Sequence, residues 1–282
     1  PDLIGELSGN FVQKLPDTCR VVFLCLGHGK TKEVFDLGWI PTRAKVIDLS
    51  ADARWELTQE KYSERHLCCG KKFVYGLAEL QPSIIRKAHF VANPGCFATA
   101  IQLALLPLAN QGELHEEVHV SAITGSTGAG AHLSSTTHFS WRSNNASIYK
   151  AFTHQHLGEI RASISSLQSK VPNIHFIPMR GAFTRGILAA CYQKIDVPEQ
   201  EIKEWFDAYY SEAPFIHLSE ESISVKQVVN TNKAIIHLEK VENQVLVTVA
   251  IDNLLKGASG QAVQNMNIMM GWDQQMGLTL KA

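Results

Sequence analysis

The sequence predicts an α/β protein built around an open parallel sheet. In the first third of the chain, short apolar runs alternate with turn-rich loops, as strands and loops do in such sheets. Residues 21–26 form a continuous apolar run, expected to be a buried strand, that leads into the Gly-rich segment 27–31. Residues 46–50 repeat the pattern, with polar residues where the strand should end, and a third run, 88–92, is stopped by Pro94-Gly95.

Length and composition bound the possible functions. The 282 residues are enough for about two domains of ordinary size. The 26 basic and 27 acidic residues leave a formal charge of -1 with no charged block, which argues against nucleic acid or an anionic membrane as a partner. No apolar run approaches the ~20 residues of a membrane span, and no signal-peptide pattern is present.

The six cysteines have no framework spacing and indicate free thiols in a reducing cytoplasm. The pair Cys68-Cys69, with His66 nearby, invites a metal interpretation. Adjacent cysteines lack the spacing of a zinc knuckle, however, and no second ligand pair follows. The sequence therefore predicts no metal site.

Cys96 stands where a tight turn gives way to an almost wholly apolar segment. Residues 97–106 carry apolar side chains at helical spacing, and Pro107 is expected to close the helix. In the first helical turn, unpaired N–H groups and the helix dipole favour a thiolate, which suits a covalent acyl intermediate. The alternative is an ordinary buried cysteine.

Two Gly-rich segments follow predicted strands. Gly27 and Gly29 would let the backbone pass close to a cofactor beyond the carboxyl end of a strand, although a plain tight turn is the alternative. The spacing is not that of a Walker phosphate loop. After the predicted strand 119–123, segment 124–130 offers amides and hydroxyls to a phosphate or a nicotinamide amide. A flexible surface loop is equally compatible with this second segment.

His154 and His156 precede a helical apolar pattern that extends to residue 167. Histidines at i and i+2 do not share a helix face, so they are not the helical metal pair of a zinc protease. One of them could act as a general base, with Glu159 as the group that orients it. The alternative is a histidine of the surface or the core.

Arg180 and Arg185 flank a turn and could bind a phosphate or a carboxylate, unless they are simply solvated. Residues 235–238 and 245–251 alternate as strands around a turn. The second strand ends in the polar, Gly-rich segment 252–261, which leads onto a helical apolar pattern and so forms another ligand-facing edge.

Six segments, in order along nearly the whole chain, carry a resemblance to a known family. They are residues 46–52, 75–80, 93–96, 125–130, 154–159 and 252–267. On these segments the chain resembles the N-acetyl-gamma-glutamyl-phosphate reductase family, the arginine-pathway relatives of aspartate-semialdehyde dehydrogenase. The last segment is long and specific, and it argues against aspartate-semialdehyde dehydrogenase itself.

The resemblance implies reduction of an acyl phosphate by NADPH to an aldehyde, with release of phosphate. Cys96 would attack the carbonyl and form a thioester. A histidine of the pair, best matched by His154 and with Glu159 behind it, would transfer protons. Arg180 or Arg185 would hold the phosphate or the substrate carboxylate.

The remaining residues that the resemblance implies divide between substrate and cofactor. Asn93 is expected at the substrate. The residues expected at NADP(H) are Gly27, Ser50, Ser126, Gly128, Ala129, Gly130 and Asn253.

The fold implied is that of a semialdehyde dehydrogenase. Residues 1–93 plus 255–282 would form a Rossmann-like NADP-binding domain, and residues 94–254 an inserted α+β catalytic and oligomerisation domain. Because a broad sheet needs covering, a homodimer or homotetramer is expected.

Two departures from the family pattern stand out. The family opens with a Gly-rich dinucleotide fingerprint, whereas this chain begins at Pro1-Asp2-Leu3, and Gly5 and Gly9 do not replace that motif. A missing first βαβ unit of about 40 residues would remove the main pyrophosphate cradle. Segment 179–186 carries one more arginine and a longer turn than expected, which would suit a larger acidic N-acyl group such as succinyl.

Two other classes of protein share these features. A cysteine hydrolase or acyltransferase would use Cys96 and the histidines without a nicotinamide. A catalytically inactive binding relative would keep the fold alone.

Overall fold

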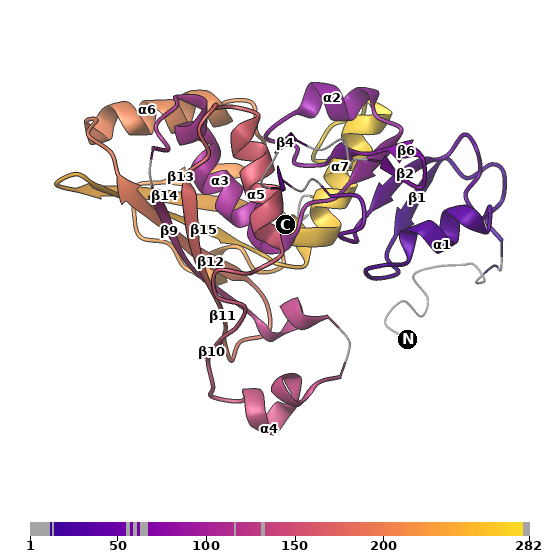
Figure 1. Cartoon of the computed structure of the whole chain (residues 1–282), viewed down its shortest axis with the longest axis horizontal. Helices are drawn as coiled ribbons and strands as arrows, with labels where there is room; N and C mark the ends of the chain where they lie inside the picture. The colour runs from indigo at the N-terminus through magenta and orange to yellow at the C-terminus, as the bar shows by residue number, and fades with distance from the viewer. Residues whose placement is uncertain are drawn as a thin grey trace.

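The computed structural model describes residues 12, 14–54, 57–58, 61–62, 67–115, 117–130 and 133–278. The expectations on Pro1-Asp2-Leu3, Gly5, Gly9 and His66 lie outside these residues. Figure 1 shows the described chain as two sheets with their helices, side by side. Within the described ranges, no helix has the length and apolar character needed to cross a membrane.

The first sheet is parallel, as predicted, and its four strands have the order β1-β2-β8-β7. Their bounds are Val21–Leu24 (β1), Lys45–Asp48 (β2), Phe90–Ala92 (β8) and Val74–Tyr75 (β7). The prediction of a continuously buried strand over 21–26 is wrong. β1 ends at Leu24, and Phe23 is 37% exposed because successive side chains of this outer strand point to opposite faces.

Three helices pack on this sheet: α1 (Thr31–Asp36), α2 (Pro82–Lys87) and α7 (Gly260–Met270). Ile268 and Met269 of α7 pack with Ile85 of α2 and with Ile47 and Val91 of the strands. The C-terminal helix therefore returns to the first sheet, as the sequence predicts. Two short antiparallel hairpins follow β2 in the chain, β3 (Leu57–Thr58) with β4 (Lys61–Tyr62) and β5 (Leu67–Cys68) with β6 (Lys71–Lys72).

The second sheet is mixed and has seven strands in the order β10-β11-β9-β12-β15-β14-β13. Their bounds are Ser147–Ile148 (β10), Asn173–Arg180 (β11), Glu117–Thr124 (β9), Ile187–Lys194 (β12), Gln244–Ile251 (β15), Ala234–Val241 (β14) and Ile216–Ser219 (β13). β9 pairs with β11 and β13 with β14 in parallel, and the other pairs are antiparallel.

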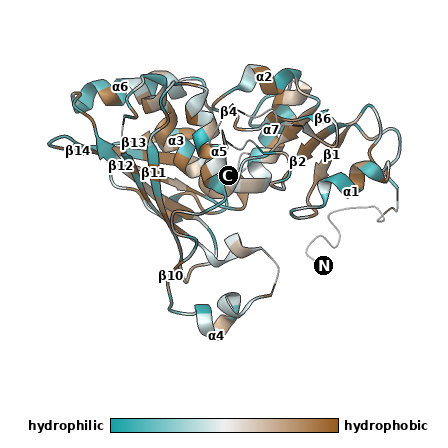
Figure 2. Cartoon of the chain, in the orientation of Figure 1, coloured by the Kyte–Doolittle hydropathy of each residue, from teal (hydrophilic) through white to brown (hydrophobic). Residues whose placement is uncertain are grey.

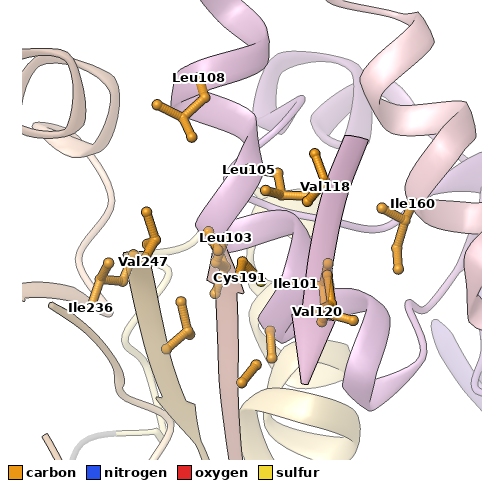
Figure 3. Close-up of a cluster of buried hydrophobic side chains, with 14 of the residues drawn as sticks. Ile101, Leu103, Leu105, Leu108, Val118, Val120, Ile160, Cys191, Ile236 and Val247 are labelled. Atoms are coloured by element: carbon orange, nitrogen blue, oxygen red, sulfur yellow. The ribbon is translucent and has the colours of Figure 1, made fainter. Parts of the chain in front are cut away.

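Helices α3 (Cys96–Asn110), α5 (His156–Ser165) and α6 (Glu199–Tyr210) cover one face of this sheet (Figure 1). Figure 3 shows Leu103 and Leu105 of α3 above Val120, Cys191 and Val247 of three strands. Apolar residues run along α3 (Figure 2), and residues 97–109 are all buried. This buried helix fixes the position of the residue that begins it, Cys96.

Pro107 does not close α3, contrary to prediction, because a contact from α6 compensates for it. A proline lacks the N–H that would bond the carbonyl four residues earlier, here that of Leu103. The Tyr210 hydroxyl donates a hydrogen bond of 2.7 Å to this carbonyl instead. The helix therefore continues to Asn110.

Short elements complete the fold around the second sheet. They are η1 (Ser126–Ala129), η2 (Ser135–Thr137), α4 (Phe139–Arg142), η3 (Val225–Gln227) and the π-helical turn η4 (Leu255–Ser259). η2 and α4 belong to a lobe that projects beside β10 (Figure 1). Arg142 joins this lobe to the sheet, because its guanidinium donates a hydrogen bond of 2.7 Å to the Arg180 carbonyl.

Candidate active site

A cavity of about 500 Å³ lies where the carboxyl ends of strands from both sheets meet. Segments that follow β1, β2 and β8 form one side. The last residues of β9 and β11 and segments that follow β9, β10 and β15 form the other. The residues with reactive or polar side chains in its lining are His28, Arg54, Cys96, Thr124, Thr127, Tyr149, Lys150, His154, Gln155, His156, Arg180 and Asn253. The structure thus brings the predicted nucleophile, both histidines and one of the two arginines into one cavity.

Cys96 is the first residue of α3 and is partly exposed to the cavity. Burial raises the pKa of its thiol to about 11, while the N–H groups of Phe97 and Cys96 and the charge of Arg54 act in the opposite direction. The helix terminus therefore favours the thiolate, as expected, but it is not the larger effect. Desolvation outweighs the terminal N–H groups, so the thiol needs a base.

His154 and His156 lie beside the cysteine, with their ring centroids 4.6 Å apart. The His156 ring packs directly over Gly95, where an added Cβ would lie 2.3 Å from Nε2, so no larger residue fits before Cys96. Burial lowers the pKa of His154 to about 3 and that of His156 well below its usual range. Both imidazoles are therefore neutral at pH 7, and the burial that keeps them neutral also makes them weaker bases than an exposed histidine.

Glu159 contacts the backbone next to the cysteine more closely than it contacts either histidine. Its Oε2 accepts hydrogen bonds from the Gly95 N–H at 2.9 Å and the Tyr75 hydroxyl at 2.8 Å. Its Oε1 lies 4.0 Å from His156 Nε2. The carboxylate therefore holds the residue before Cys96 in place, which is more than the orienting role expected of it.

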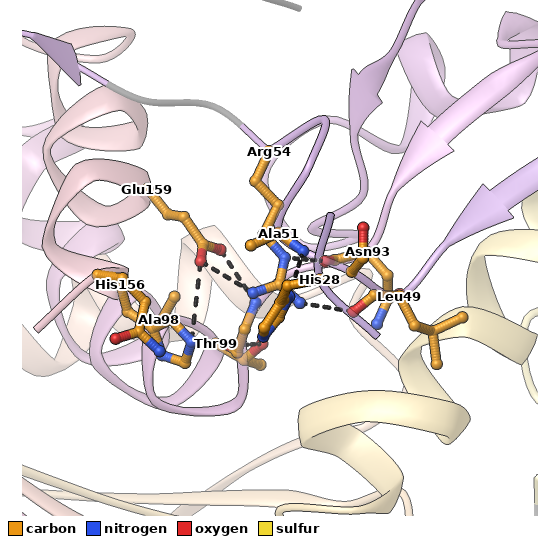
Figure 4. A network of polar contacts seen from close by, with 12 residues as sticks. His28, Leu49, Ala51, Arg54, Asn93, Ala98, Thr99, His156 and Glu159 are labelled. Atoms are coloured by element: carbon orange, nitrogen blue, oxygen red, sulfur yellow. Dashed lines mark hydrogen bonds and ion pairs between the residues drawn. The ribbon is translucent and has the colours of Figure 1, made fainter. Parts of the chain in front are cut away.

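Arg54 completes this network, as Figure 4 shows. Its guanidinium donates to Glu159 at 3.3 Å and to the carbonyls of Leu49 and Asn93 at 2.8 Å. Leu49 and Asn93 directly follow β2 and β8 of the first sheet, whereas Glu159 belongs to α5 on the second. Arg54 thus joins the two sheets at the cysteine.

Arg180 lines the cavity next to Tyr149. The Arg180 guanidinium carbon lies 4.7 Å from the centroid of the Tyr149 ring. Burial, and then the nearby Cys96, raise the pKa of Tyr149 to about 12, so this residue stays a neutral phenol. The guanidinium is held over an aromatic face at the cavity wall, where its charge can meet an anion.

Arg185 is not brought into the cavity. Its guanidinium contacts both carboxylate oxygens of Asp252, with Nε 3.1 Å from Oδ2 and an NH2 group 3.1 Å from Oδ1. Asp252 is fully buried, so this arginine neutralises a buried carboxylate. Of the two predicted arginines, only Arg180 is placed to meet a ligand.

Segment 125–130 is held in place by hydrogen bonds to the turn that follows β11. Asn253 accepts from the Gly186 N–H at 2.7 Å and donates to the Thr127 hydroxyl at 3.1 Å. Gly128, Ala129 and Gly130 line the cavity, as does Asn253, whereas the Ser126 N–H donates to the Phe183 carbonyl and Ser126 does not face the cavity. The segment is therefore an ordered cavity wall.

The first Gly-rich turn reaches the cavity through His28. Gly27 has a φ of +85°, and the amides of Gly29 and Thr31 donate to Asp52 at 2.7 and 3.1 Å. This carboxylate occupies the donors that a phosphate would need. Ser50 is buried, and its hydroxyl donates a hydrogen bond of 3.0 Å to the Asp48 carboxylate. Neither Gly27 nor Ser50 lines the cavity.

Asn93 also lies behind the cavity wall. Its side chain donates to the Ala258 carbonyl at 3.0 Å and accepts from Asn265 at 3.0 Å. It therefore joins the end of β8 to η4 and to the middle of α7, and a substrate would not touch it.

Four lining residues with titratable side chains were not predicted as site residues from the sequence: His28, Arg54, Tyr149 and Lys150. Arg54 follows the strand end at 48–52, a position that could have indicated it. Tyr149 and Lys150 follow a segment without helical or strand periodicity, and Lys150 adopts a φ of +46°. Nothing local in the sequence marks these two.

Comparison with known proteins agrees with this geometry. Residues 9–88 match the family described as semialdehyde dehydrogenase, NAD binding domain, and residues 96–253 match semialdehyde dehydrogenase, dimerisation domain. Aspartate semialdehyde dehydrogenase II from Vibrio cholerae has the same fold, with a TM-score of 0.67 at 14% identity over 90% of this chain and 81% of that chain. The enzyme from Francisella tularensis gives a TM-score of 0.63 at 14% identity, over 90% and 82% of the two chains. Fold and cavity together define a semialdehyde dehydrogenase.

Proteins of similar sequence identify the family within the semialdehyde dehydrogenases. The N-acetyl-gamma-glutamyl-phosphate reductase of Christiangramia forsetii is 49% identical over 100% of this chain and 84% of its own length. That of Flavobacterium johnsoniae is 50% identical over 99% of this chain and 84% of its own length. The chain belongs to the N-acetyl-gamma-glutamyl-phosphate reductase family, which confirms the resemblance seen in the sequence.

Proposed function

We propose that the protein reduces an N-acyl-gamma-glutamyl phosphate to the N-acylglutamate semialdehyde with NADPH, releasing phosphate, as a step of arginine biosynthesis. The observation that carries this proposal is the arrangement in one cavity of a cysteine at a helix N-terminus, two neutral histidines and an arginine. Acyl transfer needs a nucleophile, a base and cation donors, and these residues supply all three.

The first step is formation of a thioester on Cys96. The thiol loses its proton to a neutral imidazole of the histidine pair while the sulfur attacks the acyl carbonyl. N–H groups in the first turn of α3 stabilise the oxyanion. The carbon–oxygen bond to phosphate then breaks, and the imidazolium returns its proton to the departing phosphate.

Arg180 and Lys150 bind the charged ends of the substrate. Both line the cavity, and Arg180 is held on the Tyr149 ring. A phosphoryl group and an α-carboxylate are the two anions of the substrate, so two cations match them.

The cavity fits a nicotinamide cofactor. Gly128, Ala129 and Gly130 on one side and Gly257 and Ala258 on the other leave a wall without large side chains next to the cysteine, where a flat ring can lie. With His28 and Asn253, these residues would hold NADP(H). The cofactor, when bound, supplies the hydride that reduces the thioester.

Release of the aldehyde restores Cys96. In the tetrahedral oxyanion attached to the sulfur, the carbon–sulfur bond breaks. The sulfur leaves as the Cys96 thiolate, and the semialdehyde forms. The thiolate then takes a proton from solvent through the histidine pair. One phosphate leaves and one NADPH is consumed in each cycle.

The N-succinyl substrate is the second candidate. It carries one carboxylate more than the N-acetyl substrate, so one of the two cavity cations, Arg180 or Lys150, would have to bind two of its three anionic groups. Assays with both acyl phosphates decide between them. Equal kcat/KM for the two substrates, before and after Arg180→Ala, would exclude a role of Arg180 in choosing the acyl group.

Residues 1–93 plus 255–282 are assigned to the cofactor and residues 94–254 to catalysis and association. Association as a homodimer or homotetramer is supported by the match of residues 96–253 to a dimerisation domain. The helix-free face of the second sheet carries half-exposed rings, with His119 stacked on His175 and Tyr192, each at 5.1 Å. Light scattering of the purified protein tests this, and a monomer would contradict it.

The function is tested with full-length protein, NADPH and a synthetic acyl phosphate. With the wild type, NADPH absorbance should fall and an equal amount of phosphate should be released. The Cys96→Ser variant should neither consume NADPH nor release phosphate. Phosphate release without loss of NADPH would identify a cysteine hydrolase or acyltransferase. Binding without either product would identify an inactive relative.

A further inference from the structure

A π-helical turn presses directly against the nucleophile. Within η4, a Cβ added to Gly257 would lie 2.8 Å from the Cys96 Cβ and 3.2 Å from its Cα. The turn is closed by hydrogen bonds from Gly257 to Asp252 and from Ser259 to Leu254, at 2.9 and 2.8 Å. π-Helical turns are rare and occur frequently at functional sites. Gly257 is therefore the wall on one side of Cys96.

The residue before this glycine fixes the turn from behind. Lys256 has no exposed surface, and its three ammonium donors are all used, by Glu79 at 2.7 Å, Gln261 at 2.6 Å and Gln264 at 2.7 Å. Lys256 does not line the cavity, although Gly257 and Ala258 do. Its charge is consequently unavailable to a phosphate in the cavity.

Glu79 comes from a different part of the fold, the segment that follows β7 of the first sheet. Its side chain is 1% exposed, so the ion pair with Lys256 is buried on both sides. Buried ion pairs seldom add net stability compared with apolar side chains of similar volume, but they do specify one geometry. Because the three acceptors surround the Lys256 ammonium group, its side chain has one orientation, and this orientation fixes the η4 turn.

We propose that Lys256 and Glu79 are positioning residues that hold Gly257 closed on Cys96 and thereby set the direction and shielding of the nucleophilic thiol. The expected effect on turnover rests on the proposed function. The expected effect on the reactivity of the Cys96 thiol does not, because alkylation needs neither substrate nor cofactor.

The first test is the double variant Lys256→Met/Glu79→Gln, which removes both charges together and leaves no unpaired ion. Loosening the turn should lower kcat between about 10- and 100-fold, the range for misplaced reacting groups, with KM changed less than about threefold. Water should reach the thiol more easily. Alkylation of Cys96 by iodoacetamide should therefore be faster than in the wild type, with its pH midpoint shifted downward.

Gly257→Ala is the second test. If the double variant does not fold, this variant still decides whether the fit of Gly257 against Cys96 controls the thiol. It keeps the ion pair and adds only the methyl group that would meet Cys96. It should lower kcat over the same range of about 10- to 100-fold. Val46→Ala is the control, since Val46 is fully buried in a core cluster on the first sheet that includes no residue of α3 or η4. It should lower thermal stability and leave kcat and the alkylation profile unchanged.

Folded Gly257→Ala protein with wild-type kcat and a wild-type alkylation profile would overturn the proposal. The same result in the double variant would overturn the part assigned to Lys256 and Glu79. If the wild type itself shows no reductase activity, the proposed function fails, and the alkylation profiles of the variants still decide whether the turn positions the thiol.

Discussion

The Glu159 carboxylate accepts a hydrogen bond of 2.9 Å from the backbone N–H of Gly95, the residue immediately before Cys96. Through this bond α5 holds the start of α3. The same carboxylate accepts from Arg54, which bonds the ends of two strands in the first sheet. The position of Cys96 thus depends on a side chain more than 60 residues away in the sequence, and this dependence can be tested.

Glu159→Gln should lower kcat by about tenfold or more, since the variant loses the charge that pairs with Arg54, and its amide NH2 faces an N–H donor, either that of Gly95 or that of Arg54. Steady-state kinetics measure the effect. The matched control is Glu33→Gln, which makes the same change in an exposed ion pair with Lys30 and should have no effect. Equal kcat for both variants would show that Glu159 does not position the site.

Arg180→Ala should raise KM for the acyl phosphate about 10-fold or more, because a charge-assisted contact to a substrate anion is lost. Arg185→Ala should behave differently. It leaves the buried Asp252 without its cation and should lower the free energy of unfolding by about 3 kcal/mol. Kinetics and urea unfolding of the two variants separate the roles, and a raised KM for Arg185→Ala alone would reverse the assignment.

The two histidines should make stability depend on pH. The pKa of His154 falls from 6.5 in an exposed histidine to about 3 in the folded protein, because burial disfavours the imidazolium. The unfolded chain therefore binds the proton first, and stability should decrease as the pH falls below about 6.5, with a slope of about one proton per histidine. Thermal unfolding between pH 8 and about pH 4 measures this, with His154→Asn expected to flatten the slope. An unchanged slope would contradict the burial argument.

Tyr210→Phe should lower the free energy of unfolding by about 1–3 kcal/mol, since the buried Leu103 carbonyl loses its donor. Activity at temperatures well below unfolding should remain that of the wild type. Denaturant unfolding checks the first statement and the NADPH assay the second. Wild-type stability would mean that the proline inside α3 needs no compensation.

The sequence predicts the local structure of a residue where that structure depends on neighbours that are close along the chain. The strand, turn and helix around Cys96 are local, so the parallel sheet, the start of α3 and the return of α7 follow from periodicity and turn residues. The extension of α3 past Pro107 depends on Tyr210, more than 100 residues later, and no local pattern indicates it.

The roles of the charged residues also depend on contacts that are distant in the sequence. Arg180 and Arg185 are equivalent in the sequence, and only the fold shows that Asp252 neutralises one of them. The protonation of Cys96 follows from the balance between terminal N–H groups and burial, and burial is a property of the assembled cavity. The involvement of Arg54 and Lys150 likewise depends on which segments the two sheets bring together.

The central claim is that Cys96 carries the acyl group. Mixing full-length protein with the acyl phosphate in the absence of NADPH, followed by acid quenching and mass spectrometry of the digested chain, measures this directly. We predict the mass of one acyl group on the peptide that contains Cys96, with release of an equal amount of phosphate and loss of the adduct when NADPH is added. Acylation of another residue, or of the Cys96→Ser variant at the same rate, would contradict the mechanism.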